Sequence, residues 1–238
     1  MKKEKIYNIL KLLICLVFFF SISNITNFIF KIFSIDKTNI TLFDNTLYQF
    51  IVSLILFILL FILYFNTIKK NFNDFKRNLK TNILYVLKLF VIFVLLKYMI
   101  TIMSTLIVIL LKYDTSSLLS NNQEMVEKSV KTAPFLMFFS MSILGPFYEE
   151  CIFRLGFKKV INNKWIYIIV SGSLFGLLHI FPLNEGVSLI LGIVQSISYV
   201  TMGIFFSYIY YKTDNIFISI GLHFLNNFLS ILAMISML

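Results

Sequence analysis

The chain of 238 residues is 59% hydrophobic, 17% aromatic and only 13% charged, and its mean hydropathy is +0.89. These values exclude a soluble globular domain and indicate an all-α, polytopic bundle of membrane helices. The net charge of +10 does not indicate a nucleic-acid partner, because lysine and arginine gather in the cytoplasmic loops of membrane proteins. The two cysteines, Cys15 and Cys151, exclude a disulfide framework and a CxxC metal site.

Apolar runs divide the chain into about seven predicted transmembrane helices, each needing roughly 20 residues. They cover residues 12–33, 47–65, 84–111, 133–153, 165–181, 187–210 and 216–238. The first run follows a basic start but has no convincing cleavage site, so we expect an uncleaved span. Lys88 and Lys97 fall inside the third run, and we interpret both as side chains that extend along their own stems to the membrane interface.

Positive charge predicts the orientation of these spans. The connection between the second and third runs is basic, and so is the segment after the fourth run; their residues are Lys69, Lys70, Lys76, Arg77, Lys80, Arg154, Lys158, Lys159 and Lys164. Both segments should be cytoplasmic. Alternation of the loops then predicts a multi-pass protein of the cell membrane with a cytoplasmic N-terminus.

A polar stretch from residue 113 to 132 suggests two parts. Residues 1–112 would form N-terminal transmembrane helices without a recognised motif, and residues 132–238 would form a second unit that carries the polar candidates. Inside a span, an ionisable side chain costs roughly 2.5–3.5 kcal/mol on insertion scales, so it needs a partner or a function. The candidates for a site are Glu149, Glu150, Arg154, His179, His223 and Asn227.

Helical spacing separates the two adjacent carboxylates. Glu150 and Arg154 lie four residues apart in the order that favours an ion pair on one helix face. Glu149 points about 100° away and has no such partner. A Glu–Arg pair by itself often only holds helices together, and an intramembrane histidine often bonds only a backbone carbonyl. We read Cys151 as a packing residue.

The histidines belong to two further helices. Phe175 and His179 are four residues apart, as are His223 and Asn227, although Asn226 competes for the same face and spacing leaves that choice open. Three helices would thus bring a carboxylate, an imidazole, and an imidazole with an amide into one pocket. Such an inventory suits the activation of water and the stabilisation of an oxyanion.

These three patterns, Glu149-Glu150-x-x-x-Arg154, Phe175-x-x-x-His179 and His223-x-x-x-Asn227, resemble the signature motifs of the CAAX protease and bacteriocin-processing family of intramembrane proteases. The resemblance covers roughly residues 134–232. It implies an all-helical membrane endopeptidase whose substrate is a peptide or a membrane-associated protein.

The resemblance also implies a role for each candidate residue. The first glutamate, Glu149, would be the general base for water, assisted by His179. The Glu150–Arg154 pair would orient the site. The remaining pair, His223 and Asn227, would stabilise the oxyanion.

Other chemistries use the same residue types. Glu149, His179 and His223 could ligate Zn²⁺ with one open position, but there is no HExxH motif and we favour a mechanism without metal or other cofactor. A serine dyad would need Ser171 or Ser173, which more simply allow close helix packing. The aspartates lie outside the predicted spans, which argues against an aspartyl dyad.

The function predicted is hydrolysis of a peptide bond, in processing of a bacteriocin or a peptide signal. The alternative is a non-catalytic bacteriocin immunity or scaffold protein of the same fold. A proton-coupled transporter is a third class, but the sequence lacks paired broken helices and symmetric halves. The sequence does not indicate an oligomeric state.

The predicted ends of the fourth and fifth apolar runs place Glu149 and His179 at different depths in the membrane, although one pocket requires them to lie close together. Glu149 falls near the cytoplasmic end of the fourth run, whereas His179 lies near the outer end of the fifth. The 14 positions from Trp165 to His179 correspond to about 21 Å of helix rise. Convergence therefore predicts a deeper Glu149, after a helix break at Gly145-Pro146, or a fifth span that begins outside the membrane core.

Overall fold

The computed structural model describes residues 2–21, 40–114, 121–181 and 187–236, together with a few positions between 24 and 31. Each regular element in this part of the chain is helical, which confirms the all-α prediction. The α-helices are α1 (Lys2–Phe20), α3 (Leu42–Leu63), α4 (Phe65–Arg77), α5 (Leu79–Leu110), α6 (Asn121–Thr132), α7 (Pro134–Phe139), α8 (Gly145–Glu150), α9 (Phe157–Val160), α10 (Lys164–Leu177), α11 (Leu189–Thr213) and α12 (Ile216–Ile235). Two π-helical turns, η3 (Ser140–Leu144) and η4 (Cys151–Gly156), join α7, α8 and α9 into one continuous helix.

Within the described residues, five helices are long and apolar enough to cross a membrane: α3, α5, the continuous stretch Pro134–Val160, α11 and α12. The apolar helix α10 has only 14 residues. Helix α1 covers the start of the first predicted run, and most of residues 22–33 lie outside the described part of the chain. The polytopic helical bundle is confirmed, and five of the seven predicted runs meet the length and composition of a span.

Two predicted boundaries are wrong, and one connection is helical. The fourth helix continues to Val160 instead of ending at residue 153, because the charge of Arg154 is paired inside the protein and does not end the helix. The fifth ends at Leu177, and His179 lies in the turn that follows. The basic connection between the second and third runs is the helix α4.

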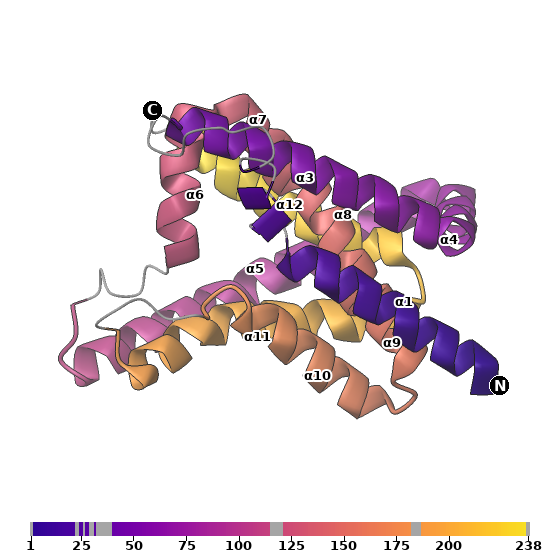
Figure 1. The fold of residues 1–238 in the computed structure, drawn as a ribbon. Helices are drawn as coiled ribbons and strands as arrows, with labels where there is room; N and C mark the ends of the chain where they lie inside the picture. Colours follow the sequence, from indigo (N-terminus) through magenta and orange to yellow (C-terminus); the bar gives the residue numbers. More distant parts are fainter. Residues whose placement is uncertain are drawn as a thin grey trace.

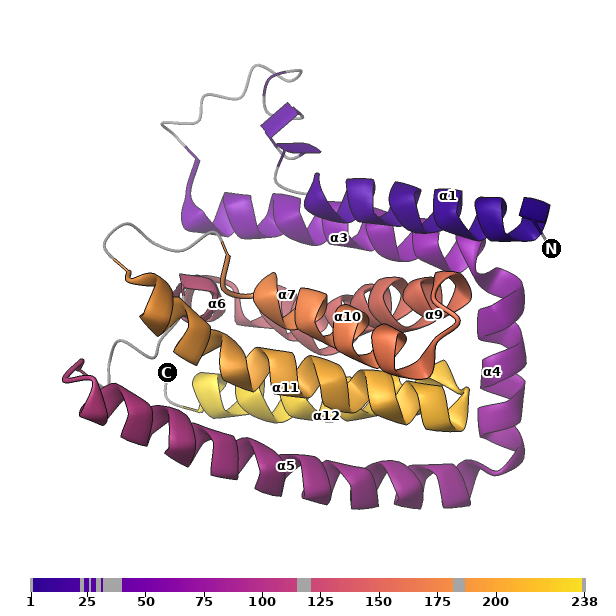
Figure 2. The ribbon, with the colours of Figure 1, turned by 90° about the horizontal axis from the view of Figure 1, so that it is seen from below.

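The helices form a bundle in which α1 and α3 lie along one side and α5 along the other (Figure 2). The Pro134–Val160 helix, α10, α11 and α12 lie between these two sides. Helix α4 crosses one end of the bundle and joins α3 to α5, whereas α6 lies near the opposite end (Figure 1). The long helices therefore run roughly side by side, as in a membrane bundle.

The basic segments lie at one end of this bundle. The N-terminus of α1, the whole of α4 and the turn between α9 and α10 share that end (Figure 2), as the distribution of lysine and arginine predicts. Its assignment to the cytoplasm stays a prediction from the charges.

One hydrophobic core joins the two parts of the chain. Leu12 and Cys15 of α1 and Leu60 of α3 belong to the same buried cluster as Cys151 and Phe153. Cys151 is fully buried, in agreement with its predicted packing role. The division at residues 112 and 132 stays a prediction about sequence pattern, since N-terminal and C-terminal helices share this core.

Glycines allow α10 and α11 to pack with their backbones in contact. A Cβ atom added to Gly172 would lie 2.5 Å from the backbone nitrogen of Ile204, and one added to Gly176 would lie 2.3 Å from that of Val200. Small residues are the usual means of such an approach between membrane helices. The contact holds the end of α10, and so His179, against α11.

Candidate active site

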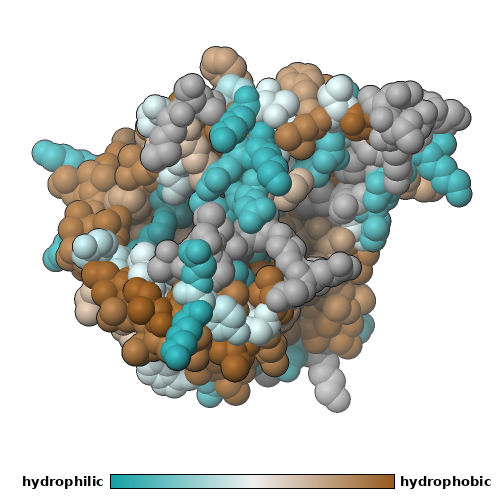
Figure 3. Space-filling view, turned by 90° about the vertical axis from the view of Figure 1, so that its left-hand side faces the viewer, coloured by the Kyte–Doolittle hydropathy of each residue, from teal (hydrophilic) through white to brown (hydrophobic). Residues whose placement is uncertain are grey.

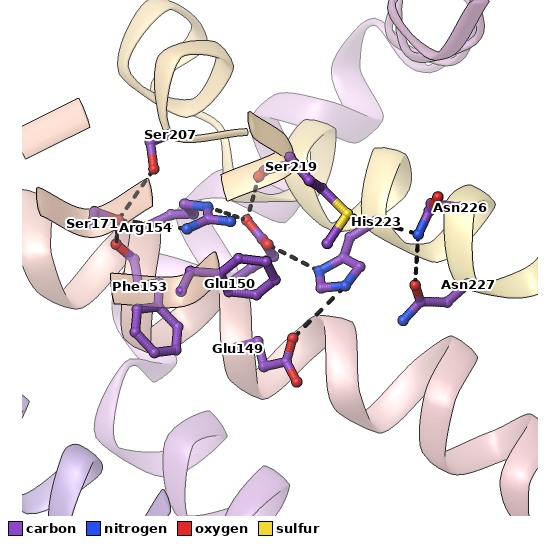
Figure 4. A network of polar contacts seen from close by, with 12 residues as sticks. Glu149, Glu150, Phe153, Arg154, Ser171, Ser207, Ser219, His223, Asn226 and Asn227 are labelled. Carbon is purple, nitrogen blue, oxygen red and sulfur yellow. Dashed lines mark hydrogen bonds and ion pairs between the residues drawn. The ribbon is translucent and has the colours of Figure 1, made fainter. Parts of the chain in front are cut away.

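Glu150 is the centre of a buried polar network (Figure 4). Its side chain and that of Arg154 are 0% exposed, and the guanidinium Nε lies 2.9 Å from Glu150 Oε2, so the predicted ion pair is present. The Ser219 hydroxyl also donates to Oε2, and His223 Nδ1 lies 3.0 Å from Oε1. Two hydrogen bonds and one ion pair thus compensate the charge of this carboxylate. Because Glu150 is fully buried and does not line the cavity described below, a substrate there does not reach it.

Arg154 connects this network to α10 and α11. Its Nη1 donates to the Ser171 hydroxyl over 3.5 Å, which in turn donates to the backbone oxygen of Phe153. Ser207 donates to Ser171 over 3.2 Å. The guanidinium carbon also lies 4.7 Å from the ring centroid of Phe175, a cation–π distance. The Glu150–Arg154 pair therefore joins the Pro134–Val160 helix to α10 through Arg154 and to α12 through Glu150.

Glu149 has a different environment from its neighbour. Its side chain is 15% exposed, and its Oε2 lies 3.7 Å from His223 Nε2. This separation exceeds a direct hydrogen bond, so the carboxylate keeps its acceptor capacity. Glu149 lines a cavity of about 460 Å³, whereas Glu150 does not. The two adjacent carboxylates thus differ as the spacing predicts.

The two histidines reach the cavity from different sides. His179 Nδ1 lies 2.9 Å from the backbone oxygen of Phe175. A carbonyl only accepts, so Nδ1 carries a hydrogen, and in the neutral ring Nε2 is then the nitrogen with the lone pair. The His179 ring stacks on Tyr199 at a centroid distance of 4.9 Å. His223 donates from Nδ1 to Glu150 and directs Nε2 toward Glu149. Both rings are held in one orientation.

The start of α12 is fixed by α4, which positions His223 two turns later. Asn71 Oδ1 accepts the backbone N–H of Ile216 over 2.7 Å, and the Asn71 backbone oxygen accepts from Asn215 Nδ2 over 2.9 Å. Asn215 in turn caps the helix by accepting the N–H of Phe217. These bonds set the rotation of α12 and direct His223 and Asn227 toward the Pro134–Val160 helix.

Pro146 creates the acceptor that Asn227 uses. Gly145 N–H bonds to the Ser140 oxygen, the wide spacing of a π turn, and proline has no N–H. In an α-helix the Met141 oxygen would accept from Gly145 N–H, and in a π turn it would accept from residue 146, which is proline here. It therefore has neither donor, and Asn227 Nδ2 donates to it over 2.8 Å. The predicted helix break at Gly145-Pro146 is wrong: the chain accommodates the proline with a π turn, which occurs often at functional sites.

Hydrogen bonds distinguish Asn226 from Asn227, the pair that spacing leaves open. Asn226 Nδ2 donates to Asn227 Oδ1 over 2.9 Å and contacts the Met202 sulfur at 3.8 Å, so both of its N–H groups have partners. Asn227 uses one N–H for Met141, and its other N–H has no partner among the residues that the structure describes. Both residues line the cavity, and Asn227 is the better donor for a ligand.

Lys97 is a residue that sequence reasoning misplaced. Its Nζ donates to Asn226 Oδ1 over 3.1 Å, and it lines the same cavity as Glu149 and His179. The interpretation as a side chain that merely reaches the interface is therefore wrong for Lys97. A lysine inside an apolar run with threonine four residues later and serine seven residues later, all on one helix face, was the available signal.

The depth conflict disappears with the observed boundaries. Glu149 lies 11 residues before Val160, about 16 Å from the basic end of its helix, and His179 lies 15 residues after Lys164, about 22 Å from the same end. The helix carrying Glu149 extends seven residues beyond its predicted end at residue 153, so Glu149 lies deeper in the bundle than the apolar run indicates. Glu149 and His179 therefore line one cavity.

The other chemistries can be compared with this geometry. Ser171 donates its hydroxyl to a backbone oxygen and, like Ser173, does not line the cavity. Glu149, His179 and His223 carry the donor types that zinc prefers, but among the described residues no group of three His, Cys, Asp or Glu side chains is placed to hold a metal ion. The expectation of a metal-free reaction stays a prediction.

The cavity is formed by α5, α6, α11, α12, the Pro134–Val160 helix and the turn after α10 that carries His179. Helix α6 contributes Gln123 and Val126 to its wall. Seen from the end of the bundle near α6, hydrophilic side chains gather across the upper middle of the face, and hydrophobic ones lie on its flanks (Figure 3). The end of the bundle near α6 is thus hydrophilic in its upper middle and hydrophobic at its flanks (Figure 3).

Comparison with known proteins bears on the same segment. Residues 131–229 match the model of a protein family described as Type II CAAX prenyl endopeptidase Rce1-like. No curated protein and no solved structure matches the chain significantly. The family match spans the Pro134–Val160 helix, α10, α11 and most of α12, and so includes each of the six predicted site residues. It confirms the predicted resemblance: this segment of a multi-pass membrane protein is similar to the Rce1-like family of CAAX proteases.

Proposed function

We propose that the protein is an intramembrane endopeptidase that hydrolyses a peptide bond with water activated by Glu149 and His179. The observation that carries the proposal is the contrast between two adjacent carboxylates, one fully compensated by Arg154, Ser219 and His223, the other open to a polar cavity. The family match supports the protease class. Processing of a bacteriocin or a peptide signal is our proposal for the substrate.

In the proposed reaction, Glu149 accepts a proton from water while the water oxygen bonds to the substrate carbonyl carbon. The lone pair on His179 Nε2 accepts a hydrogen bond from the second O–H of that water and so orients the water molecule. Collapse of the tetrahedral intermediate breaks the C–N bond, and Glu149 returns its proton to the leaving nitrogen. Water and peptide are thus converted into a carboxylic acid and an amine with no other reactant.

The oxyanion of the intermediate needs hydrogen-bond donors. Asn227 donates one N–H to Met141 and offers the other. When the His223 ring is protonated, its Nε2, which is directed toward Glu149, is a second donor. Donors that are fixed before the reaction stabilise such a charge without reorganisation. The Glu150–Arg154 pair holds His223 in this orientation.

Hydrolysis predicts a specific isotope result. Purified protein in liposomes, incubated with a mixture of apolar peptides in H₂¹⁸O, should release fragments that carry one ¹⁸O atom in each new C-terminal carboxylate. Mass spectrometry of the fragments measures this directly. Tight binding of peptides without any labelled fragment would contradict hydrolysis and favour the immunity or scaffold alternative.

A separate prediction concerns metal. The proposed mechanism uses only side chains, so activity should be unchanged after prolonged treatment with EDTA and 1,10-phenanthroline. The measurement is the rate of peptide cleavage before and after dialysis. Loss of the rate with recovery on addition of Zn²⁺ would instead assign Glu149, His179 and His223 as ligands.

A further inference from the structure

A polar stripe on α5 faces the cavity. Lys97, Thr101 and Ser104 lie at positions i, i+4 and i+7 of this helix, and all three line the cavity wall. They lie outside residues 131–229, the segment that matches the Rce1-like family. The stripe therefore belongs to this chain's own N-terminal part, and the proposed reaction does not use it.

The charge of Lys97 has no anion beside it. The ion pairs among the described residues join other cations, and the contact of Lys97 Nζ is the neutral amide oxygen of Asn226 at 3.1 Å. An ammonium group has three N–H donors, so two remain for a ligand. Lys97 lies near the middle of a helix long enough to span the membrane, where an uncompensated cation is unfavourable.

Ser104 is a second, independent sign of a ligand. It is 4% exposed, it lines the cavity, and its hydroxyl has no hydrogen-bond partner among the described residues. A buried hydroxyl without a partner costs free energy unless a ligand supplies one. A cation and an unsatisfied hydroxyl on one helix face together suit a carboxylate, which accepts several hydrogen bonds.

We propose that Lys97, Thr101 and Ser104 form a subsite for a carboxylate group of the peptide substrate. The identity of the ligand as a peptide rests on the proposed function. Asn226 lies one turn beyond His223 on α12, a rise of about 4.5 Å, and an extended peptide advances about 3.3–3.6 Å per residue. A carboxylate on Lys97 would thus belong to a residue close in sequence to the scissile bond, either as the C-terminus or as an acidic side chain.

The test measures binding, so it does not depend on hydrolysis. The protein is reconstituted in nanodiscs as the Glu149→Gln variant, and the probes are three forms of one dansylated apolar heptapeptide. One form has a free C-terminal carboxylate, the second a C-terminal carboxamide, and the third a carboxamide with one internal glutamate. Fluorescence anisotropy gives the dissociation constant of each form.

We expect at least one carboxylate form to bind about tenfold more tightly than the uncharged carboxamide, and the form preferred identifies the source of the carboxylate. Lys97→Met should remove this preference, whereas Lys97→Arg and the matched control Lys88→Met, on the same helix but away from the cavity, should keep it.

Two results would overturn the subsite: no tighter binding of either carboxylate form than of the carboxamide, or a preference that survives Lys97→Met. If Lys97 only positions Asn226, Lys97→Met should weaken all three forms equally and leave their ratio unchanged. A carboxylate preference in this binding test, together with no ¹⁸O-labelled fragments from the wild-type protein, would support the subsite and contradict the peptidase function.

Discussion

Glu149→Gln should lower the rate of peptide hydrolysis by about 10²–10⁴-fold, the usual contribution of a positioned general base. The amide has nearly the same shape as the carboxylate but cannot accept a proton from water. Because the carboxylate of Glu149 lies 3.7 Å from His223, beyond a direct hydrogen bond, its replacement by an amide breaks none of the bonds to Glu150, and the variant should fold and insert normally. The measurement is the rate of cleavage in liposomes at equal protein concentration.

The matched control is Glu124→Gln, an exposed glutamate on α6 that does not line the cavity. It removes the same charge and should keep the wild-type rate. A Glu149→Gln variant that cleaves peptides at that rate, with ¹⁸O in the product, would show that another group activates the water. Glu150 is the nearest alternative in sequence, but it is fully buried and does not line the cavity, so water bound in the cavity does not reach it.

The motifs were predictable because helical spacing is local. Glu150 and Arg154 must share a face in any helix, so their ion pair follows from four-residue spacing alone. The same argument predicted that Glu149 would lack this partner. His179 lines the same cavity as Glu149, but the prediction of a helix face was wrong: α10 ends at Leu177, and the ring is held by a bond to the Phe175 oxygen from the following turn.

Features that depend on several helices were not predictable from spacing. The role of Asn227 as the donor to Met141 requires the π turn that Pro146 imposes on one helix and the rotation of α12 that Asn71 fixes from another. The polar face of Lys97, Thr101 and Ser104 was visible in the spacing, but the contact of Lys97 with Asn226 depends on the packing of α5 against α12. Hydropathy also ended the fourth span too early, because it treats Arg154 as a solvated charge and cannot detect a buried pair.

Arg154→Met should destabilise the folded protein by about 3–5 kcal/mol, the usual cost of removing one partner of a buried ion pair. The variant leaves the Glu150 carboxylate fully buried with only Ser219 and His223 as donors, and it also removes the bond to Ser171 and the contact with Phe175. Unfolding in mixed micelles with increasing SDS measures the loss. Activity should fall as well, since the carboxylate that accepts the hydrogen bond from His223 is no longer held in place by Arg154.

The chain offers a matched exposed pair as the control. Arg77 and Asp74 lie 3.8 Å apart with side chains 75% and 43% exposed, so Arg77→Met should change stability by less than about 1 kcal/mol. Combining Glu150→Gln with Arg154→Met removes both charges together and should recover part of the stability lost by Arg154→Met alone. Equal stability of Arg154→Met and the wild-type protein would mean that the pair does not hold the Pro134–Val160 helix, α10 and α12 together. Recovery of stability without recovery of activity in the double variant would separate the two tasks of the pair: compensation of charge in the core, and orientation of His223 beside Glu149.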